Sequence, residues 1–142
     1  MERTKFKLGR YKNGVGVYAE VALAIESNDE GPLIEFMCSG RGFFSQGYVE
    51  DVPAAGYDHW KEGARVGILF ALQVAGSEKW SVRVLQIEGM ATDTNPTIVG
   101  VAAAFAAWKS LNFEPSTEIV ENIESQAFAS WRLPRLAIPE FS

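Results

Sequence analysis

The segment SGRGFF holds one candidate binding residue, Arg41, which lies between two glycines and is followed by Phe43 and Phe44. A guanidinium beside aromatic rings is able to bind an anion or to stack on a nucleic-acid base. Glycines on both sides of an arginine are equally typical of a tight turn. The segment therefore has two interpretations, a cationic aromatic loop and a simple turn.

A second set of candidate binding residues, Thr92, Asp93, Thr94 and Asn95, comes directly before Pro96 and an uncharged run. Asn95 is a favoured N-cap, because its side-chain oxygen accepts a hydrogen bond from an unpaired N–H inside the helix, and proline suits the first helical position. The N–H groups and partial positive charge of a helix start would also hold a small anion. Because Asp93 repels an anion, helix capping is the simpler interpretation.

Few other side chains point to catalysis or metal binding. His59 is the only histidine, near the start of an expected helix, and Cys38 is the only cysteine, near the end of an expected strand. Without a carboxylate cluster at ligand spacing, this disfavours a zinc or iron site and a Ser-His-Asp or Cys-His nucleophile. We expect a solvated His59, a buried Cys38, no metal and no cofactor; whether the chain is an enzyme stays open.

Length and charge bound the class of protein. The 142 residues suit one domain, and the apolar share of 47% is typical of globular, water-soluble domains. A net charge of -5 argues against general affinity for DNA, RNA or anionic membranes, because an acidic surface repels phosphates. The first twelve residues nevertheless hold five of the thirteen basic residues, which predicts the solvated outer face of a first strand.

The sequence predicts a cytoplasmic location. The N-terminus is charged and has no small-residue cleavage site, which argues against an ordinary secretory signal. A single cysteine cannot form an intramolecular disulfide. The most apolar run, residues 96–108, is shorter than the roughly 20 residues that a membrane span needs.

Apolar residues alternate in residues 15–25, which places six of them on one face of a strand. Turn-forming residues 27–32 and a second apolar run at 33–38 follow, so we expect a hairpin between the two runs. The glycine-rich segment 39–53 is typical of a loop, a bulged strand or both.

A further strand is expected from Trp80 to about Glu88. Trp80, Val82 and Val84 alternate, whereas Leu85 and Ile87 have the opposite parity. Either both faces of this strand are covered or a β-bulge shifts its register.

Residues 60–75 and 96–108 have the three- and four-residue spacing of helices, and Gly76 suits the end of the first. Both helices carry small residues: Gly63, Ala64, Gly67 and Ala71 in the first, and Gly100, Ala103, Ala104 and Ala107 in the second. Facing small surfaces let two helix backbones approach closely, so we expect the helices side by side on one face of the sheet. Replacing Gly63 or Gly67 by leucine should destabilise the fold by roughly 1 to 3 kcal/mol.

Residues 113–142 differ in character from residues 1–112. They contain three prolines and only short apolar groups, with Ile119, Val120 and Ile123 on one helical turn. Their apolar surface is costly to leave in water. We expect a single domain over 1–112 and a C-terminal extension that docks on it or on a neighbouring subunit, with Trp131 as the anchor of a subunit contact.

Five segments within residues 10–112 carry a family resemblance: YAEVALAI, EF, EGARVGILFAL, VRVLQIEG and IVGVAAAFAAWK. Together they resemble domain IV of the translation elongation factor G family. The resemblance implies an α+β fold of order β-β-β-α-β-α, with a four-stranded sheet, two helices on one face and a left-handed crossover. Most parallel connections are right-handed, so this hand is implied by the resemblance alone.

The resemblance also implies where function would lie. In that family the loop before the last helix enters the ribosomal decoding region and carries a histidine; here the loop is Met90–Thr94, without histidine. The chain has no GxxxxGK(S/T) loop, so GTP hydrolysis is not inherited. The segment AEVALAIESNDEGPLIEF is also similar to formaldehyde-activating enzymes of the same superfamily, whose catalytic histidine would fall at Glu20.

The expected function is that of a non-catalytic binding domain that forms a homo-oligomer through its C-terminal extension. One alternative is a small enzyme with a pocket at a subunit interface, like the formaldehyde-activating family. Another is a ribosome-associated RNA-binding module, which the resemblance favours and the acidic charge opposes.

Overall fold

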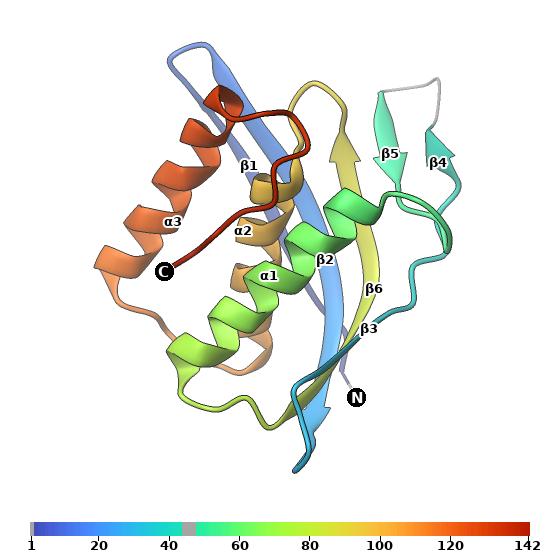
Figure 1. Cartoon of the computed structure of the whole chain (residues 1–142), viewed down its shortest axis with the longest axis vertical. Helices are drawn as coiled ribbons and strands as arrows, with labels where there is room; N and C mark the ends of the chain where they lie inside the picture. Colours follow the sequence, from blue (N-terminus) through green and yellow to red (C-terminus); the bar gives the residue numbers. More distant parts are fainter. Residues whose placement is uncertain (1, 44–47) are drawn as a thin grey trace.

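The computed structural model describes residues 2–43 and 48–142, which form a mixed α/β domain with a mostly antiparallel sheet (Figure 1). Phe44 and Gly47 of the glycine-rich segment lie outside the described residues. The described elements are, in chain order, β1 (Thr4–Lys12), β2 (Val15–Ser27), β3 (Leu33–Phe36), β4 (Gly42–Phe43), β5 (Val49–Asp51), α1 (Asp58–Ala75), β6 (Trp80–Met90), α2 (Pro96–Ser110), α3 (Thr117–Ala129) and the short 3-10 helix η1 (Ser130–Arg132).

The first hairpin joins β1 to β2. The two strands pair antiparallel, with Lys12 opposite Val15, so that Asn13 and Gly14 form a two-residue turn. Both turn residues have positive φ, 52° and 79°, which is the type I′ geometry that Asn-Gly favours. The hairpin predicted between residues 15–25 and 33–38 is therefore wrong, because β2 pairs with β1 on one side and with β6 on the other.

The strand order is β1-β2-β6-β5-β4, and β3 pairs with β6 in parallel. β3 lies along the first half of β6, beside Ser81–Val84, whereas β5 lies beside its end at Glu88–Met90. Within the described residues the sheet has six strands in place of the four expected, because the glycine-rich segment contributes the short strands β4 and β5.

A β-bulge in β6 explains the change of parity seen in its sequence. The register between β2 and β6 shifts between Ala22 and Leu23, and Leu85 is left without a partner on β2. The extra residue turns Ile87 to the same face as Val84, and both are fully buried. Of the two interpretations left open for this strand, the bulge is confirmed.

The predicted pairing of α1 and α2 is confirmed. The two helices lie side by side over the sheet (Figure 1). A Cβ atom added at Gly63 would collide with the backbone carbonyl of Pro96, and one added at Gly67 would collide with that of Gly100. The glycines are thus required by direct contact between the two backbones.

Both predicted helix ends are confirmed as well. Gly76 ends α1 in the left-handed conformation, and its N–H donates to the carbonyls of Leu72 and Gln73. Asn95 caps α2 through its side chain. α2 is the most buried helix, covered by α1, α3 and the sheet, yet no helix of the described residues is long and apolar enough to cross a membrane.

The C-terminal extension packs on its own domain. α3 begins at the N-cap Ser116 and buries Ile123 and Ala127 against the rest of the chain. Trp131 donates a hydrogen bond of 3.0 Å from Nε1 to the carbonyl of Gly16 in β2. Near the end of the chain, the ring of Phe141 lies 5.6 Å from that of Phe70 in α1. Much of the apolar surface of the extension is therefore covered without a second chain.

Candidate functional site

One face of the sheet is open. The helices α1, α2 and α3 all lie on the same side of the sheet, and none of the described elements covers the other side (Figure 1). Strand alternation sends Tyr18 and Glu20 of β2 to this open face, while Val17 and Ala19 point toward the helices and are buried. The open face is thus the largest surface on which this sheet presents side chains to solvent.

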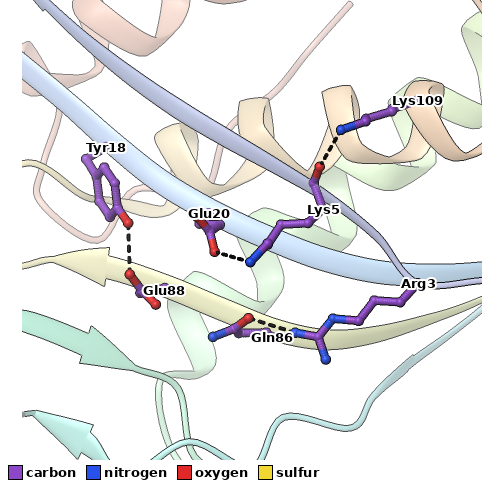
Figure 2. Close-up of polar contacts among 7 residues, drawn as sticks. All are labelled: Arg3, Lys5, Tyr18, Glu20, Gln86, Glu88 and Lys109. Atoms are coloured by element: carbon purple, nitrogen blue, oxygen red, sulfur yellow. Dashed lines mark hydrogen bonds and ion pairs between the residues drawn. The ribbon is translucent and has the colours of Figure 1, made fainter.

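A network of polar side chains occupies the centre of the open face (Figure 2). The hydroxyl of Tyr18 donates to Oε1 of Glu88 at 2.9 Å. Lys5 Nζ lies 3.3 Å from Oε1 of Glu20, and Lys7 Nζ lies 5.7 Å from the centre of the Tyr18 ring. Three neighbouring strands, β1, β2 and β6, therefore contribute to one cluster.

Long side chains bridge the strands beside this cluster. Arg3 reaches from the start of β1 to Gln86 of β6, where a guanidinium nitrogen donates to Oε1 at 2.8 Å (Figure 2). Ala22 and Ala24 of β2, which are at most 3% exposed, leave room for such side chains above them. From the other layer, Lys109 Nζ of α2 donates to the backbone carbonyl of Lys5 at 3.0 Å.

The network holds Tyr18 as a hydrogen-bond donor. Burial, and then the Glu88 carboxylate that accepts its hydrogen bond, raise the pKa of the Tyr18 phenol above its ordinary value. A neutral phenol between a carboxylate and a lysine stays protonated at neutral pH. The cluster is arranged to present fixed charges and hydrogen-bonding groups, and Glu20 is held by the ion pair with Lys5.

A groove of about 550 Å³ opens at the start of α1, on the helix side of the sheet. The hydroxyl of Tyr57 donates to Glu50 Oε1 at 2.8 Å, and the Tyr57 ring lies 5.2 Å from that of Trp60. Burial, and then Glu50, raise the pKa of Tyr57 to about 12. His59 and Arg135 also line this groove, so the lone histidine meets the C-terminal extension there.

A larger hollow of about 890 Å³ lies between the end of the β1–β2 hairpin and α3. Its lining includes the aromatic residues Tyr11, Phe128 and Trp131 together with the cations Arg10 and Arg132. Arg10 Nε lies 3.9 Å from Glu124 Oε2 across it. No local sequence pattern predicts this hollow, because it forms where the extension meets the hairpin.

Two of the predicted binding residues, Thr94 and Asn95, are buried and support the backbone. The hydroxyl of Thr94 accepts a hydrogen bond from the N–H of Met90 and donates to the carbonyl of Tyr18. The amide oxygen of Asn95 accepts from the N–H of Ile98 at 2.9 Å, and its nitrogen donates to the Ser130 hydroxyl at 2.9 Å. Their polar groups face partners within the chain, which supports the capping interpretation.

The other predicted binding residues do not converge. Thr92 is exposed, and the carboxylate of Asp93 lies beside Gly16 of β2, where an added Cβ would meet it at 3.1 Å. Arg41 is exposed directly before β4. Within the described residues, no hydrogen bond or ion pair joins Arg41 to the loop 92–95.

Cys38 is buried, and burial raises the pKa of its thiol above the ordinary value, which disfavours the reactive thiolate form. His59 is exposed near the start of α1. Across residues 2–43 and 48–142, no group of three or more histidine, cysteine, aspartate or glutamate side chains is placed to hold a metal ion.

Comparison with known proteins finds no family model and no curated protein that matches this chain. Among solved structures, the chain is similar to the crystal structure of ttk003000868 from Thermus thermophilus, at 18% sequence identity and a TM-score of 0.54. The similarity covers 91% of this chain and 20% of that one. It shows the fold alone, and this chain spans about a fifth of the length of that protein.

Proposed function

We propose that this chain is a non-catalytic binding domain of the elongation factor G domain IV type, and that the open face of its sheet is the contact surface. The observation that carries the proposal is the cluster of polar pairs in Figure 2, which are held by hydrogen bonds and one ion pair on a face without a covering element among those described. Polar networks that keep their geometry are suited to recognition, because few side chains need to be ordered on binding.

The hand of the connection between β3 and β6 is part of the same proposal. β3 and β6 are parallel neighbours, and the chain passes between them through β4, β5 and α1. We assign this connection the left-handed crossover of the elongation factor G domain. In the longer Thermus thermophilus protein, a fold similar to this one makes up about a fifth of the chain.

A matched pair of variants tests the contact surface. Gln86→Arg places a cation at the centre of the open face beside Arg3, whereas Gln73→Arg makes the same exchange at an exposed position of α1. Self-association by light scattering and co-sedimentation with ribosomes are measured for both. The proposal predicts at least one complex that Gln86→Arg weakens and Gln73→Arg leaves unchanged; no complex, or equal loss in both variants, would contradict it.

A ribosome-associated RNA-binding module is the second candidate function. The observation that favours it is the set of cations Arg3, Lys5 and Lys7, which occupy alternate positions from just before β1 into its first half. Tyr11, near the end of the same strand, is exposed. Phosphate contacts of this kind are strongly weakened by salt. Co-sedimentation with ribosomes at low salt that is lost at moderate salt would support this function. No co-sedimentation at either salt concentration would contradict it.

A further inference from the structure

Three carboxylates form a row across the open face, which we call the carboxylate row. Glu20 of β2 lies opposite Glu88 of β6, and Glu88 lies opposite Asp51 of β5. Side chains directly opposite in an antiparallel pair project from the same face, and like charges in these positions repel each other. Among the described ion pairs, Lys5 with Glu20 is the one that involves this row, so the row carries an excess of negative charge.

The opposite edge of the same face carries the opposite charge. Arg3, Lys5 and Lys7 occupy alternate positions at the start of β1, all are exposed, and we call them the basic stripe. Lys7 lies opposite Glu20 in the sheet, so the stripe and the row are adjacent. At the level of the carboxylate row, the open face is therefore divided into a cationic edge on β1 and an anionic edge on β6 and β5. Further along the face, Arg83 of β6 lies opposite Ala24 and beside Glu35 of β3.

Apolar side chains are exposed on this face too. Leu33 is 47% exposed and Met37 is 55% exposed, at the start and just beyond the end of β3. They alternate with Ile34 and Phe36, which pack against the core, so they point to the open side. A protein interface combines such apolar contacts with complementary charges, whereas a purely solvated face needs neither.

We propose that the occupant of the open face is a second copy of this chain, with the basic stripe of each copy over the carboxylate row of the other. This inference rests on the proposed function and names its partner. A twofold axis parallel to the strands, between two facing sheets, places β1 of each copy over the β6–β5 edge of the other. Each contact is then made twice, as in any isologous dimer.

The two charged edges favour a copy of the chain over other occupants. A basic peptide would engage the carboxylate row and leave the basic stripe unpaired, and an RNA would do the reverse. A second copy matches both edges with one interface. Facing sheets lie about 10 Å apart, a gap that lysine and arginine side chains reach across.

A charge-exchange experiment tests this arrangement. The variant Lys5→Glu/Lys7→Glu makes the β1 edge predominantly acidic, like the carboxylate row, and Glu88→Lys/Asp51→Lys makes the β6–β5 edge predominantly basic, like the basic stripe. Light scattering should give a dimer for the wild type and a monomer for each variant, with a dissociation constant raised at least about tenfold by like-charge contacts. An equimolar mixture of the two variants should recover the dimer, because an acidic face then meets a basic one in both directions.

Two controls make the outcome decisive. Arg65→Glu/Lys79→Glu changes the net charge as the basic-stripe variant does, but at exposed positions outside the open face, and it should remain dimeric. Circular dichroism must show that each variant is folded.

A charge-exchange variant that stays dimeric, or an equimolar mixture that stays monomeric, would overturn the inference. A monomeric wild type would also overturn it, while ribosome binding lost only in Gln86→Arg would leave the proposed function standing.

Discussion

The two faces of this sheet differ in what holds their side chains in place. Toward the helices, β2 presents apolar residues that are at most 2% exposed, namely Val17, Ala19, Val21 and Leu23. On the open face, the same strand presents Tyr18 and Glu20, followed by the small residues Ala22 and Ala24 beside long polar side chains of the neighbouring strands. Apolar burial and close backbone contact stabilise the first face, and exposed ion pairs add little to the second. Substitutions of residues on the open face should therefore cost little stability, so these residues can be selected for binding.

The largest predicted effect lies where the two covering helices touch. Gly67→Leu should lower the free energy of unfolding by about 3 kcal/mol, the upper end of the usual cost of overpacking, because the new side chain meets the Gly100 backbone. Urea unfolding measures this loss. At Gly9 of β1, where an added Cβ has no neighbour within 4 Å, the same exchange to leucine should leave stability almost unchanged. Equal losses at Gly67 and Gly9 would remove the helix contact as an explanation.

The next effect separates a buried helix cap from an exposed one. Asn95→Ala should cost about 2 kcal/mol, because it leaves the N–H of Ile98 without its partner and removes the hydrogen bond to Ser130. Ser116→Ala removes the exposed cap of α3 and should cost about 0.5 kcal/mol. Thermal unfolding of both variants gives the comparison, and the capping account fails if the exposed cap proves the costlier to remove.

The stability of the fold should fall at alkaline pH, because Tyr18 and Tyr57 are held protonated as hydrogen-bond donors. Tyr57 has its pKa raised to about 12 from an ordinary value of about 10, and the pKa of Tyr18 is raised too. Between these values the unfolded chain loses a proton that the folded chain keeps, so the stabilisation is complete below pH 10 and falls as pH rises toward 12.

The variants Tyr57→Phe and Tyr18→Phe should each reduce that fall in stability. Urea unfolding at about pH 9 and about pH 11 measures it for the wild type and for each variant. If the wild type is as stable at the higher pH as at the lower one, the two hydrogen bonds to Glu50 and Glu88 do not hold the phenols protonated.

The smallest effect on stability is predicted for the basic stripe. Lys5→Gln removes an ion pair whose lysine side chain is 55% exposed, and it should change the free energy of unfolding by less than about 1 kcal/mol. Under the proposed docking it should weaken self-association several-fold. A large loss of stability would instead place Lys5 among the residues that hold the fold, and the two faces would then differ less than we infer.

Local sequence signals predicted the covered layer well. The cap residues Gly76 and Asn95, and the glycines that let α1 and α2 touch, act through contacts within one element or between two backbones. Such requirements restrict the residue type at a single position, so they can be predicted from a single sequence. The change of parity after Val84 likewise indicated the bulge in β6.

Strand pairing was less predictable, because it depends on contacts between distant parts of the chain. The Asn13-Gly14 turn is a strong hairpin signal that joins β1 to β2, whereas the two apolar runs at residues 15–25 and 33–38 wrongly predicted a pairing of β2 with β3. Nothing local reveals that residues 33–36 pair in parallel with β6, some 50 residues further along. The short strands β4 and β5 depend on the same non-local pairing.

The candidate site was predictable only in part. Polar type and position suggested Thr92–Asn95, yet Thr94 and Asn95 use their polar groups to support the chain itself. Tyr18 and Glu88 lie 70 residues apart in sequence, and only the register of β2 with β6 brings them together. The alternation of Arg3, Lys5 and Lys7 in β1 was the one available sign of a charged open face.

The central claim is that two copies of this chain associate through the open faces of their sheets, and light scattering of the wild type beside Gln86→Arg tests it most directly. We predict a mass of twice the 15.6 kDa chain for the wild type and of a single chain for the variant at the same concentration. The same mass for both proteins, together with an unchanged mass for Gln73→Arg, would contradict the claim.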